Sequence, residues 1–264
     1  MYFKDKVVWI TGASSGIGEA LAYSLAKQNA KLVISSQIED QLKRVKDKCL
    51  TICDNCIDIV FDLLDTSKIN EKTNDIIFKY GKIDILINCG GISQRSFASE
   101  TPIEIDRKIM EINFFGAIAL TKACLPYMIE KNEGHIVAIS SIVGKFGFPL
   151  RSAYSASKHA IFGFFDSLRF EISQKNINVT IICPGRINTN VSVNAITKDG
   201  NTYGKMDDGQ GSGMSADKCA QKILNAIKNK KNEAYIGNKE ILMVYIKRFF
   251  PGIFNKISSK IKPT

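Results

Sequence analysis

The chain has 264 residues, of which 45% are hydrophobic and 23% are charged, as in ordinary globular proteins. Its length suits one α/β domain with a full core, although length alone also allows two small domains. A formal net charge of +10 fits a soluble surface, a phosphate-bearing ligand or an anionic surface. The lysines are scattered and form no basic stripe with interleaved aromatic residues, which argues against a nucleic-acid partner.

The seven cysteines do not follow a metal-binding pattern. Cys49, Cys53 and Cys56 lie close together, but they lack the spacing of paired Cys-x-x-Cys knuckles and have no fourth Cys or His nearby. We therefore expect reduced thiols and no metal site. The start of the chain does not resemble a signal peptide, and no apolar run approaches the ~18 residues of a membrane-spanning helix. These observations predict a cytoplasmic protein.

Short runs rich in Val and Ile alternate with longer helical patterns. The predicted strands cover 7–10, 31–35, 57–61, 83–88, 135–140 and 179–183. The predicted helices cover 17–29, 38–48, 67–80, 103–131 and 153–175. This alternation predicts one doubly wound α/β domain over residues 1–264, with a parallel sheet and helices on both of its faces. Ligands of such a domain bind at the carboxyl ends of the strands.

Two segments break this alternation. Residues 187–213 are rich in Asn, Gly, Asp and Ser, and a long irregular segment is a functional lid or a disordered loop. Because the segment follows the last clear core strand, we predict a substrate lid. Residues 240–264 form a basic, amphipathic tail that Pro251 interrupts. The tail could cover a substrate mouth of its own or a partner subunit, contact an anionic membrane weakly, or pack on the core.

Tyr154 and Lys158 lie four positions apart in the predicted helix 153–175, which places them on one face, one turn apart. A nearby ammonium favours phenolate and should lower the pKa of the tyrosine from about 10. Tyr154 is therefore a candidate general acid/base for an alcohol or carbonyl group. The Tyr-x-x-x-Lys pair is common by itself, but Ser141, the second residue of a Ser-Ser pair, stands thirteen positions upstream.

The first predicted strand runs into Thr11-Gly12-Ala13-Ser14-Ser15-Gly16-Ile17-Gly18, and a helix follows. Glycines let backbone N–H groups approach a pyrophosphate, and a helix N-terminus favours its negative charge. The spacing differs from the Gly-x-Gly-x-x-Gly fingerprint, and the motif alone also fits a tight strand-to-helix turn. Its position after the first strand favours a dinucleotide.

Together these motifs resemble the short-chain dehydrogenase/reductase family. The residues that match in order and spacing, between about Lys6 and Tyr235, are the glycine motif, Asn88-Cys89-Gly90-Gly91, Asn113, Ser141, Tyr154, Lys158 and Pro184-Gly185. The segments 144–149 and 163–169 are similar to the 11-beta-hydroxysteroid-dehydrogenase-like subgroup. The resemblance implies a Rossmann domain and an NAD(P)-dependent oxidoreductase. Such an enzyme transfers a hydride between nicotinamide and a carbonyl or secondary alcohol.

The resemblance also assigns roles to individual residues. Tyr154 would exchange the proton of the substrate oxygen, Ser141 would polarise that oxygen, and Lys158 would lower the pKa of the tyrosine and bind the nicotinamide ribose. Asn113 would hold a water in a proton relay. The implied cofactor contacts are Gly12, Ser14, Ser15, Gly16, Ile17, Gly18, Ser36, Gln37, Asp62, Asn88, Gly90, Tyr154, Lys158, Pro184, Gly185 and Thr189. Among them, Asp62 would lie near the adenine, Asn88 would steady its strand and contact the adenosine, and Thr189 would meet the carboxamide.

The choice between NAD(H) and NADP(H) depends on the end of the second strand. An acidic residue there binds the ribose 2′-OH of NAD, and an arginine accepts the 2′-phosphate of NADP. Ser36 and Gln37 stand at these positions, so neither diagnostic residue is present. Because no carboxylate at Ser36 repels a phosphate, we favour NADP(H). Cys89 replaces the usual alanine, and we expect no functional change from a small buried thiol.

The substrate is weakly specified. Phe146, Phe148, Pro149 and Leu150 precede Tyr154 and either line a pocket for a lipophilic ketone or alcohol or pack in the core. An NAD-dependent alcohol dehydrogenase working oxidatively is one alternative function. A non-catalytic nucleotide-binding sensor or scaffold on the same fold is another. The resemblance further implies a homodimer or homotetramer through helices 103–131 and 153–175.

Overall fold

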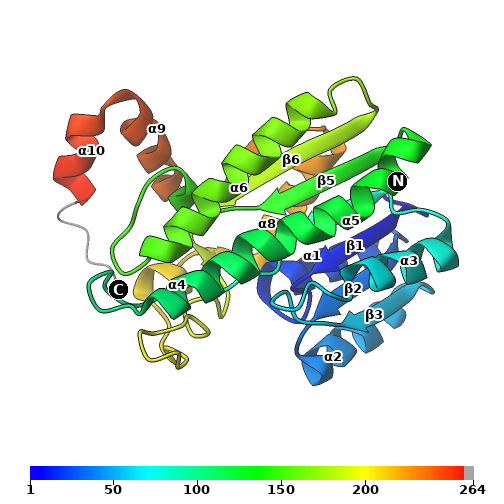
Figure 1. Ribbon diagram of the computed structural model, residues 1–264, viewed down its shortest axis with the longest axis horizontal. Helices are drawn as coiled ribbons and strands as arrows, with labels where there is room; N and C mark the ends of the chain where they lie inside the picture. Colours follow the sequence, from blue (N-terminus) through cyan, green and yellow to red (C-terminus); the bar gives the residue numbers. More distant parts are fainter. Residues whose placement is uncertain (259–264) are drawn as a thin grey trace.

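A computed structural model describes residues 1–258. A parallel sheet lies between a layer of helices on each face (Figure 1). Its strands are β1 Val7–Thr11, β2 Lys31–Ser36, β3 Cys56–Val60, β4 Ile85–Asn88, β5 Gly134–Ile139, β6 Ile177–Pro184 and β9 Glu233–Ile236. Across the sheet the order is β3-β2-β1-β4-β5-β6-β9, and every neighbouring pair is parallel. The fold is therefore the expected single doubly wound α/β domain.

The helices divide between the two faces of the sheet. One face carries α1 Gly16–Ala26, α2 Glu39–Leu50 and α8 Ala216–Lys228. The other carries α3 Ile69–Tyr80, α5 Gly116–Lys131 and α6 Ser152–Glu171, with α4 Ile103–Met110 leading into α5. Shorter elements are the π-helical turn Glu111–Phe115, the 3-10 turns Ile142–Gly144 and Lys239–Ile241, β7 Ile187–Asn188, α7 Asp208–Gly211, β8 Met214–Ser215, α9 Leu242–Phe249 and α10 Pro251–Ser258.

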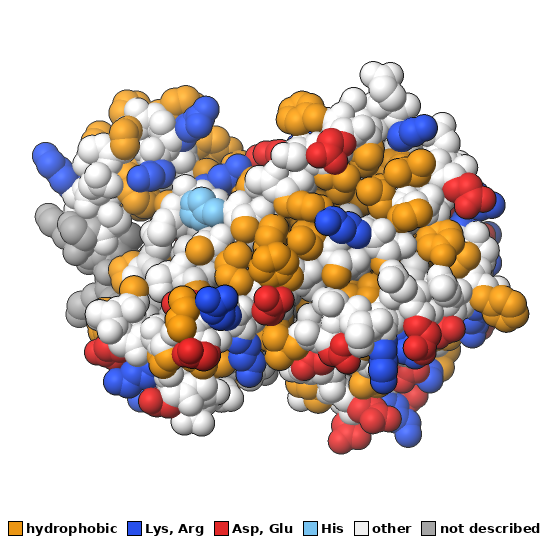
Figure 2. All heavy atoms as spheres, in the orientation of Figure 1, with side chains coloured by type: hydrophobic (Ala, Val, Ile, Leu, Met, Phe, Trp, Pro, Cys, Tyr) orange, Lys and Arg blue, Asp and Glu red, His pale blue; other side chains and the backbone are white. Residues whose placement is uncertain are grey.

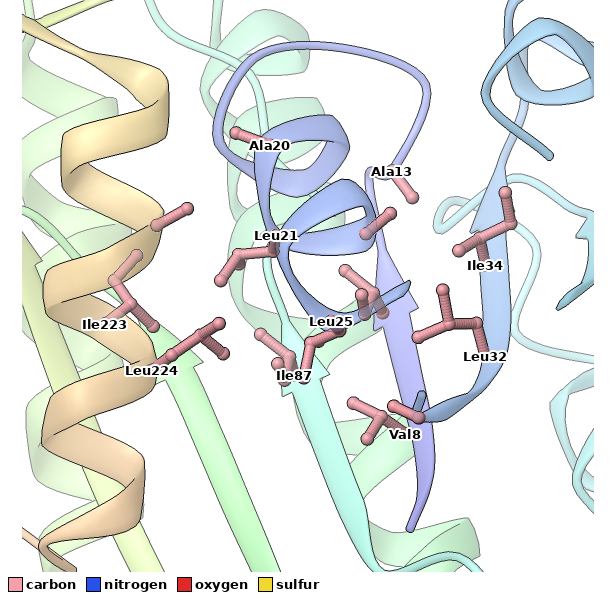
Figure 3. Close-up of a cluster of buried hydrophobic side chains, with 14 of the residues drawn as sticks. Val8, Ala13, Ala20, Leu21, Leu25, Leu32, Ile34, Ile87, Ile223 and Leu224 are labelled. Carbon is pink, nitrogen blue, oxygen red and sulfur yellow. The ribbon is translucent and has the colours of Figure 1, made fainter. Parts of the chain in front are cut away.

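The core explains why the central strands are continuous apolar runs. Every residue of β1 is buried, because helices cover both of its faces. Figure 3 shows one face, where Leu21 and Leu25 of α1 pack beside Ile223 of α8 and above Ile87 of β4. Each such side chain contributes roughly 1.5–3 kcal/mol when fully buried. This packing fixes the strands, and with them the loops at their carboxyl ends.

The strand order reverses between β1 and β4, because β2 and β3 continue on one side and β5, β6 and β9 on the other. Loops that leave the carboxyl ends of β1 and β4 diverge to opposite faces, and this switch point is where ligands bind in doubly wound folds. In Figure 1 the segment 187–213 and the helices α9 and α10 lie at this same end of the molecule. The fold thus gathers the motifs along one edge of the sheet.

The helix α8 and the edge strand β9 have no counterpart among the elements expected from sequence. The strand β9 has only four residues and one buried side chain. So short and half-exposed a strand leaves no hydrophobic alternation to read. The expected helix 103–131 is continuous but contains the π-helical turn. Its length and hydropathy would suit a membrane span, contrary to the expectation, yet Ala117, Leu120 and Cys124 pack against the sheet.

Candidate active site

A cleft of about 500 Å³ opens at the carboxyl ends of β1, β4 and β5. It is lined by nearly all of the residues that the sequence predicts for the site. These are Gly12, Ser14, Ser15, Gly16, Ile17, Gly18, Ser36, Gln37, Asp62, Gly90, Ser141, Tyr154, Lys158, Pro184, Gly185 and Thr189. Asn88 and Asn113 lie outside the lining.

The turn between β1 and α1 needs glycine for two reasons. Gly12 has a φ of +64°, and a Cβ there would lie 2.7 Å from the Cα of Gly90. A Cβ on Gly18 would lie 2.3 Å from the carbonyl oxygen of Gly12. The Thr11 hydroxyl accepts hydrogen bonds from the backbone N–H groups of Cys89 and Gly90, each at 3.0 Å, and so ties the β4 loop to this turn. The result is a cradle at the N-terminus of α1, which suits a pyrophosphate.

The catalytic candidates come together from β5 and α6. Tyr154 and Lys158 lie one turn apart near the start of α6, and the Lys158 Nζ is 5.7 Å from the Tyr154 ring centre. Ser141 lies two residues after β5, and its hydroxyl donates to the Pro184 carbonyl at 3.3 Å and lines the cleft together with Tyr154. Lys158 donates to the carbonyl of Ile139 at 2.9 Å, which holds the ammonium against the strand end. The predicted triad is therefore assembled around one point of the cleft.

Asn113 occupies the π-helical turn between α4 and α5. Its Nδ2 donates to the carbonyl of Ile92 at 2.9 Å and to the Ser157 hydroxyl at 3.0 Å, and its Oδ1 accepts from the Ile92 N–H at 2.8 Å. The π turn shifts the side chain away from the regular helical register, as such turns do at functional sites. The asparagine thus joins the β4 loop to α6. The predicted water relay stays a prediction.

Gln94 is a positioning residue that the sequence motifs do not reveal. It is fully buried, and its Oε1 accepts hydrogen bonds from the backbone N–H groups of Ala153 at 2.9 Å and Tyr154 at 3.4 Å. These N–H groups belong to the first turn of α6, where the helix itself supplies no acceptor. The Gln94 amide nitrogen donates to the hydroxyls of Ser96 and Ser152. A glutamine from the β4 loop therefore caps the helix at the candidate catalytic tyrosine.

The charge states of the site follow from burial. Desolvation raises the pKa of the Tyr154 phenol above its ordinary value, and the Ser141 hydrogen bond and the charges of Arg151 and Arg95 oppose that rise. Desolvation also lowers the pKa of Lys158 to about 8. The expected fall of the tyrosine pKa is therefore wrong in this structure, because burial outweighs the neighbouring positive charges.

Comparison with known proteins gives the family. Residues 6–200 match the model of the short chain dehydrogenases. The chain belongs to the short-chain dehydrogenase family. The family is one of oxidoreductases, and its expected membership is confirmed, whereas the placement in the 11-beta-hydroxysteroid-dehydrogenase-like subgroup stays a prediction.

Several relatives and solved structures are similar. Dehydrogenase/reductase SDR family member 7B of Mus musculus is 43% identical over 261 residues, which cover 97% of this chain and 81% of the mouse protein. The Dehydrogenase/reductase SDR family protein 7-like of Anopheles gambiae is 48% identical over 231 residues, which cover 86% of this chain and 73% of the mosquito protein. A short-chain dehydrogenase from Streptomyces avermitilis superimposes with a TM-score of 0.82 at 26% identity, covering 97% of this chain and 98% of that one. A short-chain dehydrogenase/reductase from Burkholderia phymatum, solved in complex with NAD, superimposes with a TM-score of 0.84 at 22% identity, covering 100% of this chain and 98% of that one. At this identity the likeness shows the fold alone.

The β2 end of this short-chain dehydrogenase holds its polar side chains through mutual contacts. The Ser36 hydroxyl lies 2.8 Å from that of Ser14, and the Gln37 amide, with its nitrogen turned towards Asp62, donates to Oδ2 at 2.9 Å. Arg44 of α2, which the motifs do not single out, donates to the Ser14 carbonyl at 3.2 Å and pairs with Glu19 at 2.7 Å. A guanidinium thus stands beside the turn that follows β1.

Asn88 and Cys89 take supporting positions. The Asn88 amide donates to the Thr121 hydroxyl at 3.0 Å, which fixes the end of β4 against α5. This position fits the steadying role, and the side chain lies outside the cleft lining. Burial raises the pKa of the Cys89 thiol to about 12, which keeps it protonated and unreactive. Within residues 1–258 no group of three or more His, Cys, Asp or Glu side chains is arranged to hold a metal ion.

The segment 187–213 borders the cleft. Asn190, Val191, Asn194 and Thr202 contribute to the lining. Its backbone joins the β4 loop, because the Ile196 N–H donates to the Ser93 carbonyl and the Arg95 N–H to the Ile196 carbonyl, each at 2.9 Å. This placement supports the lid prediction.

The tail packs beside the candidate catalytic residue Tyr154. Val244 of α9 and Phe254 of α10 are buried against Ile142, Val143 and Phe146, and Tyr154 borders this apolar cluster. Phe146 is therefore a core residue beneath the tail and does not line the cleft. Phe148 packs at the edge of the same cluster. Residues 259–264 of the predicted tail lie outside the described part of the chain.

Proposed function

We propose that this protein is an NADP(H)-dependent oxidoreductase that interconverts a carbonyl and a secondary alcohol. The observation that carries the proposal is the meeting of Tyr154, Ser141 and Lys158 at the same cleft as the glycine cradle. Bound nicotinamide would supply or accept the hydride. A scaffold protein would need the cradle but would have no chemical use for the buried tyrosine, serine and lysine beside it.

The protein's own residues would control position and proton transfer. The Ser141 hydroxyl would donate to the substrate oxygen and polarise it, and Tyr154 would give that oxygen a proton in reduction or take one in oxidation. Lys158, held by the Ile139 carbonyl one turn from Tyr154, would add a positive charge that opposes the burial-driven rise of the tyrosine pKa, and would bind the nicotinamide ribose. Asn113 would keep the β4 loop and α6 in register, as its contacts with Ile92 and Ser157 support.

Cofactor choice is argued from the β2 end. The Ser36 hydroxyl can donate to a 2′-phosphate where a carboxylate would repel it, and Arg44 lies beside the same turn. The Asp62 carboxylate, which faces Gln37, would repel a 2′-phosphate and so favours NAD(H). We favour NADP(H), and an NAD-dependent alcohol dehydrogenase working oxidatively is the alternative.

We further propose a lipophilic ketone or alcohol as substrate, as in the 11-beta-hydroxysteroid-dehydrogenase-like subgroup. Tyr154 borders the apolar cluster of Ile142, Val143, Phe146, Val244 and Phe254, and the cleft lining itself includes Ile92, Ile112, Ile187 and Val191, which supports an apolar substrate. The segment 187–213 would close over the substrate, since its Val191 and Asn194 line the same cleft as the glycine cradle. We place this enzyme in the cytoplasm.

Assembly into a homodimer or homotetramer through α5 and α6 is also proposed. Hydrophobic side chains gather over these helices on the face shown in Figure 2. The exposed hydrophobic residues of these helices include Ile129 of α5 and Phe170 of α6, of which Phe170 is 74% exposed. Exposed apolar patches of this kind mark protein interfaces. Light scattering coupled to size-exclusion chromatography of the wild type and of Phe170→Glu tests the proposal, and a monomeric wild type would contradict it.

Replacing Tyr154 by Phe tests the proposed chemistry. The substitution removes only the phenolic hydroxyl, so kcat should fall by roughly 10²–10⁴-fold while cofactor affinity stays nearly unchanged. A panel of ketones and alcohols assayed with NADP(H) and NAD(H) supplies the substrate, and nucleotide fluorescence gives the affinity. Turnover within a few-fold of wild type would contradict the acid/base role of Tyr154 and favour a non-catalytic sensor or scaffold.

A further inference from the structure

Three charged side chains meet where the segment 187–213 reaches the catalytic helix. Arg95 follows β4, Asp207 belongs to that segment, and Arg151 directly precedes α6. Arg95 donates to the Asp207 carboxylate from Nε at 3.1 Å and also from Nη2, and Arg151 Nη2 donates to Oδ2 at 2.8 Å. The side chains of Arg95, Asp207 and Arg151 are only 2%, 7% and 12% exposed. Because removing one partner would strand a buried charge, this carboxylate resists displacement.

The Arg95 guanidinium is also fixed to the loop that follows β4. Arg95 Nη1 donates to the Ser93 hydroxyl at 2.9 Å and to the Gln94 carbonyl at 2.6 Å. The aromatic ring of Tyr203, from the segment 187–213, lies 5.9 Å from the Arg95 guanidinium carbon. Arg95 is therefore held by its own loop and contacts the segment 187–213 through Asp207 and Tyr203.

Gln94 and Arg95 are adjacent residues with different targets. The Gln94 amide caps the first turn of α6 at Ala153 and Tyr154, and Arg95 binds Asp207. Arg151, one residue before α6, binds the same carboxylate. Movement of Asp207 away from the arginines would thus disturb the loop and the start of α6 that orient the tyrosine.

We propose that Gln94 and Arg95 are positioning residues that couple the seating of the segment 187–213 to the placement of Tyr154. When Asp207 lies between Arg95 and Arg151, the β4 loop is held in the position from which Gln94 caps α6. When Asp207 leaves, the cap loosens and the tyrosine loses its orientation. The proposal rests on the role of Tyr154 in the proposed function.

Hydrogen–deuterium exchange of the full chain tests the coupling without an activity assay. Asp207→Asn removes the charge between the two arginines. We expect at least ~10-fold faster exchange in peptides from 187–213 and also in those from 152–157, which include the amides that Gln94 caps. Asp207→Glu keeps the charge and should restore much of the protection in both regions.

Glu100→Gln is the matched control. Glu100 pairs with Lys198 at 3.2 Å and so also joins the segment 187–213 to the body, but both side chains are 49% exposed. Loss of an exposed pair should leave exchange within ~2-fold of wild type. If Asp207→Asn does not fold, Arg95→Lys serves instead, because it keeps the charge and loses the fork geometry.

Kinetics supply the second arm of the test. Asp207→Asn should lower kcat at least ~10-fold and leave nucleotide affinity within a few-fold of wild type, since Tyr154 is misplaced while the glycine cradle is untouched. Faster exchange in 187–213 with unchanged exchange in 152–157 would overturn the coupling, and so would unchanged exchange in both. A wild type without oxidoreductase activity would remove the proposed function, and the exchange data would still decide whether the two regions are coupled.

Discussion

At the scale of residues, burial sets the protonation of the groups near the sheet. Lys158 and Tyr154 both have pKa values that desolvation shifts against the charged form. His135, far from the cleft on β5, shows the same effect without any part in the proposed chemistry. Its Nε2 bonds to the Thr180 hydroxyl at 2.8 Å, and that hydroxyl donates to the Lys231 carbonyl at 2.6 Å. Nε2 is therefore the protonated nitrogen.

Acid should destabilise the fold through His135. Burial lowers its pKa from 6.5 to about 4, so the unfolded chain binds a proton that the folded chain does not between these values. The contribution of this group is fully present above pH 6.5 and is lost as pH falls towards 4, to the extent of about 3 kcal/mol. Urea unfolding of the wild type and of His135→Gln from pH 7.5 to 4 measures it. Identical pH dependences of the two proteins would contradict the prediction.

At the scale of elements, the ends of strands and the starts of helices carry the site. The turn from β1 to α1 forms the cradle, the π-helical turn orients Asn113, and the first turn of α6 presents Tyr154 under the Gln94 cap. In the proposed function the end of β2 would discriminate between the cofactors. Gln37 there is already turned to Asp62, so a substitution acts on that pair as well as on the cofactor.

Gln37→Arg should shift preference further towards NADP(H). A guanidinium adds a charge-assisted partner for the 2′-phosphate. Asp62 competes for the same guanidinium, so the shift should be larger in the double variant with Asp62→Asn. The ratio of kcat/KM for the two cofactors measures both effects. A ratio that moves towards NAD(H) would show that the β2 end is not where the 2′ position is read.

At the scale of the whole molecule, the tail packs over the apolar cluster that borders Tyr154. The helices α9 and α10 stand out at the cleft end of the sheet (Figure 1) and cover Ile142, Val143 and Phe146. Exposed apolar side chains remain on them, among them Tyr245 and Phe249. Glu240, just before α9, has a separate structural role, because its Oε1 accepts from the Arg186 N–H at 2.8 Å and the Asn238 N–H at 3.1 Å.

Deleting residues 242–264 should therefore keep the fold and change the substrate side alone. The truncation retains Glu240 and exposes the Phe146 cluster, so substrate KM should rise several-fold while nucleotide affinity is unchanged. Steady-state kinetics and nucleotide binding measure the two quantities. Deletion from residue 240 is the comparison, and it should lower stability further because two backbone N–H groups lose their acceptor.

The tail prediction has two contrary outcomes. Sedimentation with anionic vesicles that is lost on truncation and weakened by salt would favour a membrane contact over a substrate mouth. A truncated protein that fails to fold would show that α9 and α10 belong to the core.

The sequence alone determined the fold class and the main site residues. Buried parallel strands are continuous runs of Val and Ile, and a cradle that admits no Cβ requires glycines at fixed spacing, so both leave local marks. The same holds for Tyr154 and Lys158, because one helical turn separates them.

Only the tertiary structure decided the rest. Gln94, Arg95, Arg151 and Asp207 meet from three segments, and no local pattern marks such a meeting. The edge strand β9 depends on its partner β6, and Phe146 became core only because the tail covers it. The pKa of Tyr154 is raised and not lowered as the sequence predicts. The spacing of charged residues along a helix can be read from the sequence, whereas the burial that raises this pKa depends on the whole fold.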